Sequence, residues 1–234
     1  MLSDKMIRKQ MLENYIKRTP ELREKDREDS LFALDDLYES GFDSRYIPSY
    51  VYAVYDASGI LPPVTNRYDQ FVDLLSETMN IECNILEVGG GTIPCVAERI
   101  AKMQIHGGTI AVYDEKLLFN SSQIPNLKLY TKNFNCMTNI KSINMLVGVL
   151  PCQVMDLMVN RALKENKELF IQMCNCVHPV INFPGIDYSS YGTFSDEFQE
   201  ELIDHYIKLA REYGRKIKVL DKRVATCPII YSKK

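Results

Sequence analysis

The sequence predicts an α/β fold, a mostly parallel sheet preceded by a helical extension. Residues 84–94 read as a buried strand, a glycine turn and the start of a helix. Strand-like and helix-like segments then alternate along the chain, as they do when helices connect parallel strands. The last two strand patterns are joined by a turn too short for a helix, so they must pair antiparallel. We therefore expect a seven-stranded sheet that ends in an antiparallel hairpin.

The chain length and composition suit one large globular unit. We divide the 234 residues into an N-terminal helical extension, 1–80, and an α/β domain, 81–234. The net charge of −3 provides no basic field to attract nucleic acid. No apolar segment approaches the ~20 residues that span a bilayer, and the first residues do not resemble a secretory signal. These observations predict a soluble protein with no membrane partner.

The cysteines give no sign of a disulfide framework or a metal site. Seven are scattered along the chain, and several lie in predicted strands or helices, which is typical of reduced thiols in the cytoplasm. Cys174, Cys176 and His178 alternate, so on a strand they would share one face as zinc ligands can. No fourth ligand is evident, and we predict no metal site.

The extension shows helical patterns and no strand pattern. We expect helices over residues 2–16, from 20 to about 40, and over 46–55, where tyrosines are frequent. A fourth helix begins after Thr65 or Asn66 and carries an apolar face. That face consists of Phe71, Val72, Leu75 and Met79.

The glycine turn is the first candidate ligand site. Ile85, Leu86 and Val88 suit a strand that is covered on both faces. The three glycines at 89–91 allow positive φ and leave no side chain between the backbone and a ligand. Pro94 suits the first helical position. Such a junction brings backbone N–H groups and a helix N-terminus to one ligand.

The segment Glu87-Val88-Gly89-Gly90-Gly91 resembles the acid-h-G-x-G motif of class I S-adenosylmethionine-dependent methyltransferases, whose fold is Rossmann-like. The resemblance implies that Glu87, Gly89, Gly90 and Gly91 bind S-adenosylmethionine. Residues 108–114 read as a second strand that ends in Asp114, 25 positions after Gly89 (114 − 89). In Rossmann-like folds such an acid holds the ribose hydroxyls, and its acceptor-only carboxylate matches a diol. We therefore predict Asp114 as the ribose ligand.

Two further strand ends add candidate cofactor residues. After a third strand at 126–131, the resemblance places Asn133 and Phe134 beside the adenine, although the family usually has Asp where Asn133 stands. The alternative is an Asn in a turn and a Phe in the core. After a fourth strand at 143–151, the backbone of Leu150 would line the pocket. Asn144 also stands where Asp is frequent.

The rest of the α/β domain separates related families. A fifth strand is predicted at 168–173, then a long helix that stops at Gly214, then strands at 216–221 and 225–232. A terminal antiparallel hairpin is the methyltransferase arrangement, whereas nucleotide dehydrogenases use a parallel sixth strand. The dinucleotide motif also requires Gly where Pro94 stands. Both features favour S-adenosylmethionine over NAD.

The prediction is a methyltransferase that acts on a small molecule or metabolite and releases S-adenosylhomocysteine. Residues 149–152 lack the Asn/Asp-Pro-Pro-aromatic motif, which argues against adenine-N6 or glutamine methylation. Methyl transfer depends on positioning, so no catalytic residue is predicted. Two segments are candidate substrate elements: the loop at 174–193, where His178 could act as a base for a hydroxyl acceptor, and a lid at 50–68 that includes Tyr68. A packed histidine and packed tyrosines are the simpler interpretation.

Two alternatives remain open at this stage. One is a non-catalytic S-adenosylmethionine-binding or scaffold protein, which could form a homodimer through its N-terminal helices. The other is an RNA methyltransferase, which the acidic balance of charge disfavours.

Overall fold

The computed structural model describes residues 67–91, 94–117, 122, 124–151, 154–173, 196–221, 224 and 227–234, together with four helical positions at 13, 17, 28 and 31. The predicted helix over 46–55, most of the earlier helices, most of the predicted lid and the loop at 174–193 lie outside these residues. Within the described part, no helix is long and apolar enough to cross a membrane.

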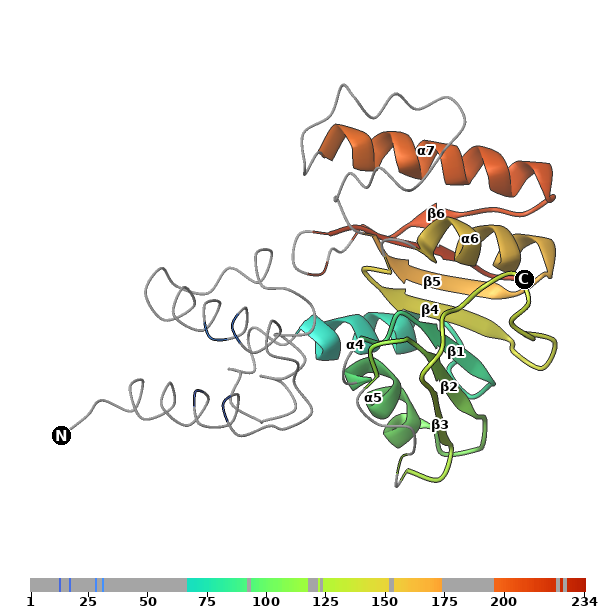
Figure 1. Cartoon of the computed structure of the whole chain (residues 1–234). Coiled ribbons are helices and arrows are strands. Elements are labelled where there is room, and N and C mark those ends of the chain that lie inside the picture. The colour runs from blue at the N-terminus through green and yellow to red at the C-terminus, as the bar shows by residue number, and fades with distance from the viewer. Residues whose placement is uncertain are drawn as a thin grey trace.

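The sheet has seven strands in the order β3-β2-β1-β4-β5-β7-β6 (Figure 1). The first five strands pair in parallel, and β7 lies antiparallel between β5 and β6. This order confirms the predicted α/β, Rossmann-like sheet and its terminal hairpin. The strands are β1 (Ile85–Val88), β2 (Ile110–Tyr113), β3 (Leu127–Tyr130), β4 (Met145–Val149), β5 (Glu168–Gln172), β6 (Lys218–Val219) and β7 (Ile229–Ser232).

Helices cover both faces of the sheet, so central strands such as β1 and β4 are buried on both sides (Figure 1). The helices α4 (Arg67–Thr78) and α5 (Cys95–Met103) pack on one face, and α6 (Met155–Lys164) and α7 (Asp196–Glu212) pack on the other. Successive strand residues alternate between the two cores. In β1, Ile85 faces α4 and α5, while Leu86 and Val88 face α6 and α7. This double burial explains the continuous apolar runs in the sequence.

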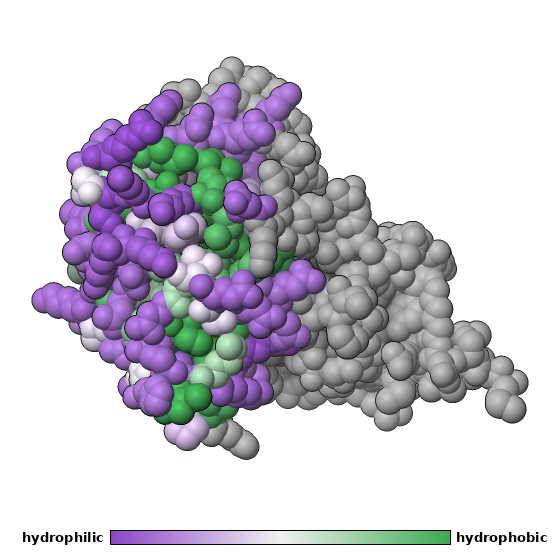
Figure 2. All heavy atoms as spheres, turned by 180° about the vertical axis from the view of Figure 1, so that it is seen from behind, coloured by the Kyte–Doolittle hydropathy of each residue, from purple (hydrophilic) through white to green (hydrophobic). Residues whose placement is uncertain are grey.

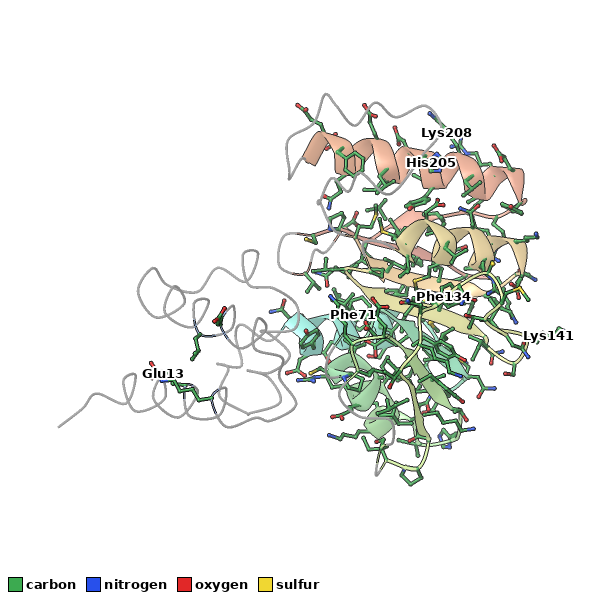
Figure 3. All side chains as sticks on the ribbon, viewed as in Figure 1. Glu13, Phe71, Phe134, Lys141, His205 and Lys208 are labelled. Carbon is green, nitrogen blue, oxygen red and sulfur yellow. The ribbon has the colours of Figure 1, made fainter. Side chains whose placement is uncertain are left out.

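Helix α4 belongs to the core of the sheet. The side chain of Phe71 in α4 (Figure 3) is fully buried. Its ring contacts the ring of Phe170 in β5 edge-on, with the two centroids 5.2 Å apart. Val72, Leu75 and Met79 join the same core, as their helical spacing predicted. The boundary proposed at residue 80 therefore falls between α4 and the sheet on which it packs.

The ends of two helices show how the sequence sets their lengths. Helix α5 begins at Cys95, so Pro94, with φ of −81°, precedes the helix by one residue instead of occupying its first position. Helix α7 stops as predicted, because Gly214 adopts φ of +65°. The N–H groups of Gly214 and Arg215 then donate to the carbonyls of Arg211 and Ala210, at 3.0 and 2.8 Å. This is the Schellman pattern of helix termination.

The connection from β3 to β4 contains no helix. Residues 131–144 cross the α6 side of the sheet in an irregular path, and they bury Phe134, Thr138 and Ile140. The guanidinium of Arg161, in α6, donates to the carbonyls of Asn135 and Thr138 at 2.8 and 2.7 Å. These bonds fix the crossover against α6. On the face shown in Figure 2, the described surface is mostly hydrophilic, with apolar residues gathered in patches.

Candidate functional site

The candidate site lies where β1, β2 and β4 end. In open parallel sheets, ligands bind at this carboxyl edge. Gly89 and Gly91 have φ of +74° and +72°, a region that residues with a Cβ rarely adopt. Leu150, directly after β4, has φ of +52° although it is not a glycine. Its N–H donates to the carbonyl of Gln172 at 3.0 Å, which fixes the end of β4 to β5.

The glycines of the turn have different surroundings. A Cβ at Gly90 would lie 2.6 Å from Cγ1 of Val112 and 3.4 Å from Cδ of Glu87, so this position is needed for close packing on β2 and β1. A Cβ at Gly91 would meet no atom of the described residues within 4 Å. Gly89 borders the other strand end, because its Cβ would lie 3.5 Å from Cβ of Pro151. Gly91 is therefore the point of the turn that a ligand can approach.

Asp114 is in direct contact with the glycine turn. Its Oδ2 accepts the N–H of Gly91 at 2.8 Å, and its Oδ1 accepts the N–H of Lys116 at 2.7 Å. The side chain is half-buried. A carboxylate offers about four lone-pair positions, and within the described residues two are used. The remaining two are the number that the two hydroxyls of a ribose require.

Glu87 lies beneath the turn and caps α5. Its side chain is 2% exposed, and Oε2 accepts the N–H of Ala97 at 3.0 Å. Ala97 is the third residue of α5, and Pro94 makes no side-chain cap there. Glu87 therefore satisfies a donor at the helix N-terminus that would otherwise be left without a partner. Burial raises the pKa of Glu87 to about 8, while the bond from Ala97 lowers it and the charges of Asp114 and Glu98 raise it.

The two predicted adenine contacts lie in different environments. Asn133 is exposed, and its Nδ2 donates to Oε2 of Glu115 at 2.7 Å. The ring of Phe134 is 4% exposed, lies on the α6 side of the sheet (Figure 3), and has the Arg161 guanidinium 5.5 Å from its centroid. A ring in this position has no open face for a purine, so the expected stacking role of Phe134 does not fit. The crossover lacks a helix, and Phe134 fills the space instead.

The structure also bears on the expectations for Tyr68, for Asn144 and for a metal site. Tyr68 is buried between α4 and α5, with the Arg99 guanidinium 5.8 Å from its ring centroid. Asn144 lies at the opposite, amino edge of the sheet, where its Oδ1 accepts the N–H of Asn84 at 3.1 Å. Its departure from the family pattern therefore concerns the sheet and not the ligand site. Within the described segments, no three His, Cys, Asp or Glu side chains are grouped as metal ligands, and Cys174, Cys176 and His178 lie outside them.

Sequence reasoning missed Glu115 and Pro151. Glu115 is exposed beside Asp114 and bonds to Asn133, so it connects the ends of β2 and β3. The two consecutive acids, Asp114 and Glu115, were the sequence signal that could have indicated Glu115. Pro151 packs against Gly89, and no local pattern in the sequence predicts that contact.

Comparison with known proteins gives structural likeness and no sequence match. Neither the protein-family models nor the curated proteins contain a match. A methyltransferase structure from Aquifex aeolicus, described as S-adenosylmethionine-dependent, is 12% identical with a TM-score of 0.48, covering 76% of this chain and 96% of its own. A putative one from Listeria monocytogenes is 12% identical with a TM-score of 0.47, covering 72% and 98%. A third, from Leishmania major, is 12% identical with a TM-score of 0.44, covering 97% and 83%. The fold assignment rests on the strand order of this chain itself.

Proposed function

We propose that this protein is an S-adenosylmethionine-dependent methyltransferase that acts on a small-molecule or metabolite acceptor and releases S-adenosylhomocysteine. The observation that carries the proposal is the contact between Asp114 and Gly91. Among the described residues, the Asp114 carboxylate keeps two unused acceptor positions and stands beside Gly91, where a Cβ would meet nothing within 4 Å. This pairing suits a nucleoside whose sugar must be held close to the backbone.

The residues at the strand ends fit the parts of this cofactor. Asp114 would hold the ribose, and the turn of Gly89, Gly90 and Gly91, supported by Glu87, would accept the methionine portion. Asn133 and Glu115 offer amide and carboxylate groups for the adenine edge. The backbone of Leu150 would close the pocket from β4.

The chain's contribution to the reaction is positioning. The sulfonium of the cofactor supplies the methyl group, and the acceptor supplies the electron pair. Holding the two reactants in line can contribute about 7–11 kcal/mol to the lowering of the barrier, provided that water is excluded. The turn, the strand ends and the fixed end of β4 hold one reactant. No general base is assigned, because His178 and the rest of the loop after β5 lie outside the described residues.

Calorimetry tests the proposal. The wild-type protein should bind S-adenosylmethionine and S-adenosylhomocysteine. Asp114→Ala should lose hydrogen bonds to a charged group, a cost of about 1.5–3 kcal/mol or roughly 10- to 150-fold in Kd. Asp73→Ala, an exposed acid of α4, is the matched control and should bind as the wild type does. Failure of the wild type to bind at millimolar ligand would refute the proposal. An unchanged Kd for Asp114→Ala would remove Asp114 from the site.

A second candidate is a non-catalytic protein that keeps the fold and the cofactor. The exposed Asn133 in place of the usual Asp favours this reading. Transfer of a labelled methyl group to any member of a broad acceptor panel would exclude it. In either case we infer a cytoplasmic setting, since the seven scattered cysteines of the sequence show no disulfide framework. A homodimer through the N-terminal helices stays a prediction.

A further inference from the structure

Two carboxyl groups border the glycine turn from different sides. Glu87 lies below it, because its carboxyl carbon would be 3.4 Å from a Cβ at Gly90. Asp114 lies beside it, 2.8 Å from the nitrogen of Gly91. A ligand seated on the turn is therefore near one half-buried and one fully buried carboxyl group.

The surroundings of Glu87 oppose its ionisation. On the neighbouring strands it is paired with Val112 and Val147, both of which are fully buried. The charged groups that act on it are Asp114, at the end of β2, and Glu98, in α5, and both are acids. Burial is the largest effect and raises the pKa to about 8, so at neutral pH Glu87 holds its proton. The N-terminus of α5, through the N–H of Ala97, is the group that favours the ionised form.

In the proposed binding mode the methionine portion lies on the turn, which would bring the ligand's sulfur near Glu87, and the two ligands differ by one charge at that sulfur. The donor carries a sulfonium cation, whereas the product carries a neutral thioether, and the rest of the two molecules is the same. A cation near a buried carboxyl group stabilises the carboxylate and promotes loss of the proton, and a neutral sulfur does not.

We propose that Glu87 is a positioning residue that selects the charge of the ligand: it gives up its proton to solvent when the sulfonium donor binds, and it keeps the proton when the thioether product binds. This inference rests on the proposed function. Ionisation needs no movement of Glu87, because the helix N-terminus it already caps accepts the new charge. The site would thereby bind the donor more tightly relative to the product as the pH rises.

The experiment is calorimetry of the full chain with S-adenosylmethionine and with S-adenosylhomocysteine. Titrations at pH 7 in buffers of different ionisation enthalpy give the number of protons released. We expect a substantial fraction of one proton to be released with the donor and almost none with the product. The ratio of the two affinities should change about tenfold between pH 6 and pH 9. Because the sulfonium also lowers the pKa of the donor's own amino group, the quantity to compare is the difference in proton release between the wild type and a variant that lacks the carboxyl group.

Two variants test whether the released proton comes from Glu87. Glu87→Gln keeps a carbonyl acceptor for Ala97 and cannot ionise, so it should show only the proton exchange of the ligands' own groups, and the wild type should exceed it by a substantial fraction of one proton with the donor and by almost none with the product. Glu82→Gln, at the opposite edge of the sheet, should release protons as the wild type does. The same donor-specific release in the wild type and in Glu87→Gln would overturn the inference. If Glu87→Gln failed to fold, equal release with both ligands in the wild type, after the separately measured titration of each free ligand is subtracted, would overturn it. Absence of any binding by the wild type would instead refute the proposed function.

Discussion

Replacing Glu87 by Gln should change how the stability of the ligand-free protein depends on pH. The folded protein holds the proton of Glu87 up to about pH 8, whereas the unfolded chain loses it near the ordinary value of 4.5. Unfolding therefore releases a proton between these two values, and the free energy of unfolding of the wild type falls as the pH rises through them. Each pKa unit corresponds to about 1.4 kcal/mol, so this carboxyl group lowers the stability by about 5 kcal/mol over the whole interval.

Urea denaturation of the wild type and of Glu87→Gln at unit steps from pH 5 to pH 9 measures this effect. Gln adds a constant difference from its new amide group, but it removes the titration. The variant should gain stability relative to the wild type by about 1.4 kcal/mol per pH unit up to about pH 8, and the gain should then level off. Parallel stability curves for the two proteins across this range would show that the buried carboxyl group is already ionised, and the reasoning about its burial would be wrong.

Three further experiments test other contacts described above. Glu82→Gln should change the pH dependence of stability in the opposite direction to Glu87→Gln, because the N–H groups of Ile105 and His106 lower the pKa of Glu82. In paired denaturation curves the excess in free energy of unfolding of the wild type over the variant should shrink as the pH falls below about 5. Gly90→Ala places a Cβ 2.6 Å from Val112 and should cost about 1–3 kcal/mol in the free energy of unfolding. Adding Val112→Ala should cost less in that background than in the wild type, and additive costs in the double-mutant cycle would contradict the contact. Arg161→Met should lose about 1.5–3 kcal/mol in urea denaturation, since its guanidinium holds the β3–β4 crossover; an unchanged midpoint would show that the crossover is held by its apolar residues alone.

The fold could be predicted because its signals are local. The apolar run at 85–88, the glycines after it and the short final turn each indicate one type of local structure. Together with the resemblance to a known family they predicted a mostly parallel sheet with a terminal hairpin, whereas the order of the strands came from the structure. The stop of α7 at Gly214 was predictable for the same reason, since a positive φ there suits glycine.

The environment of the site residues was harder to predict from the sequence. The motif indicated Glu87, but the burial that keeps its proton and the cap that it makes on α5 depend on packing between β1, β2 and the helix. The family resemblance placed Phe134 beside the adenine, whereas in the structure its ring is buried in the core on the α6 side, where the crossover has no helix. Asn144 looked like a departure in the site, and only the structure shows that it bonds to Asn84 at the far edge.

The placement of β7 has a consequence for the order in which this protein can be assembled. Although β7 follows β6 in the sequence, it lies between β5 and β6, with Ile229 and Ile230 completing the two opposite cores. During synthesis from the N-terminus, β5 is made some sixty residues before this neighbour, and until then one side of it has no partner. A chain that has not yet reached β7 can therefore pair its five parallel strands, but β5 keeps an open edge and β6 has no neighbour in the sheet.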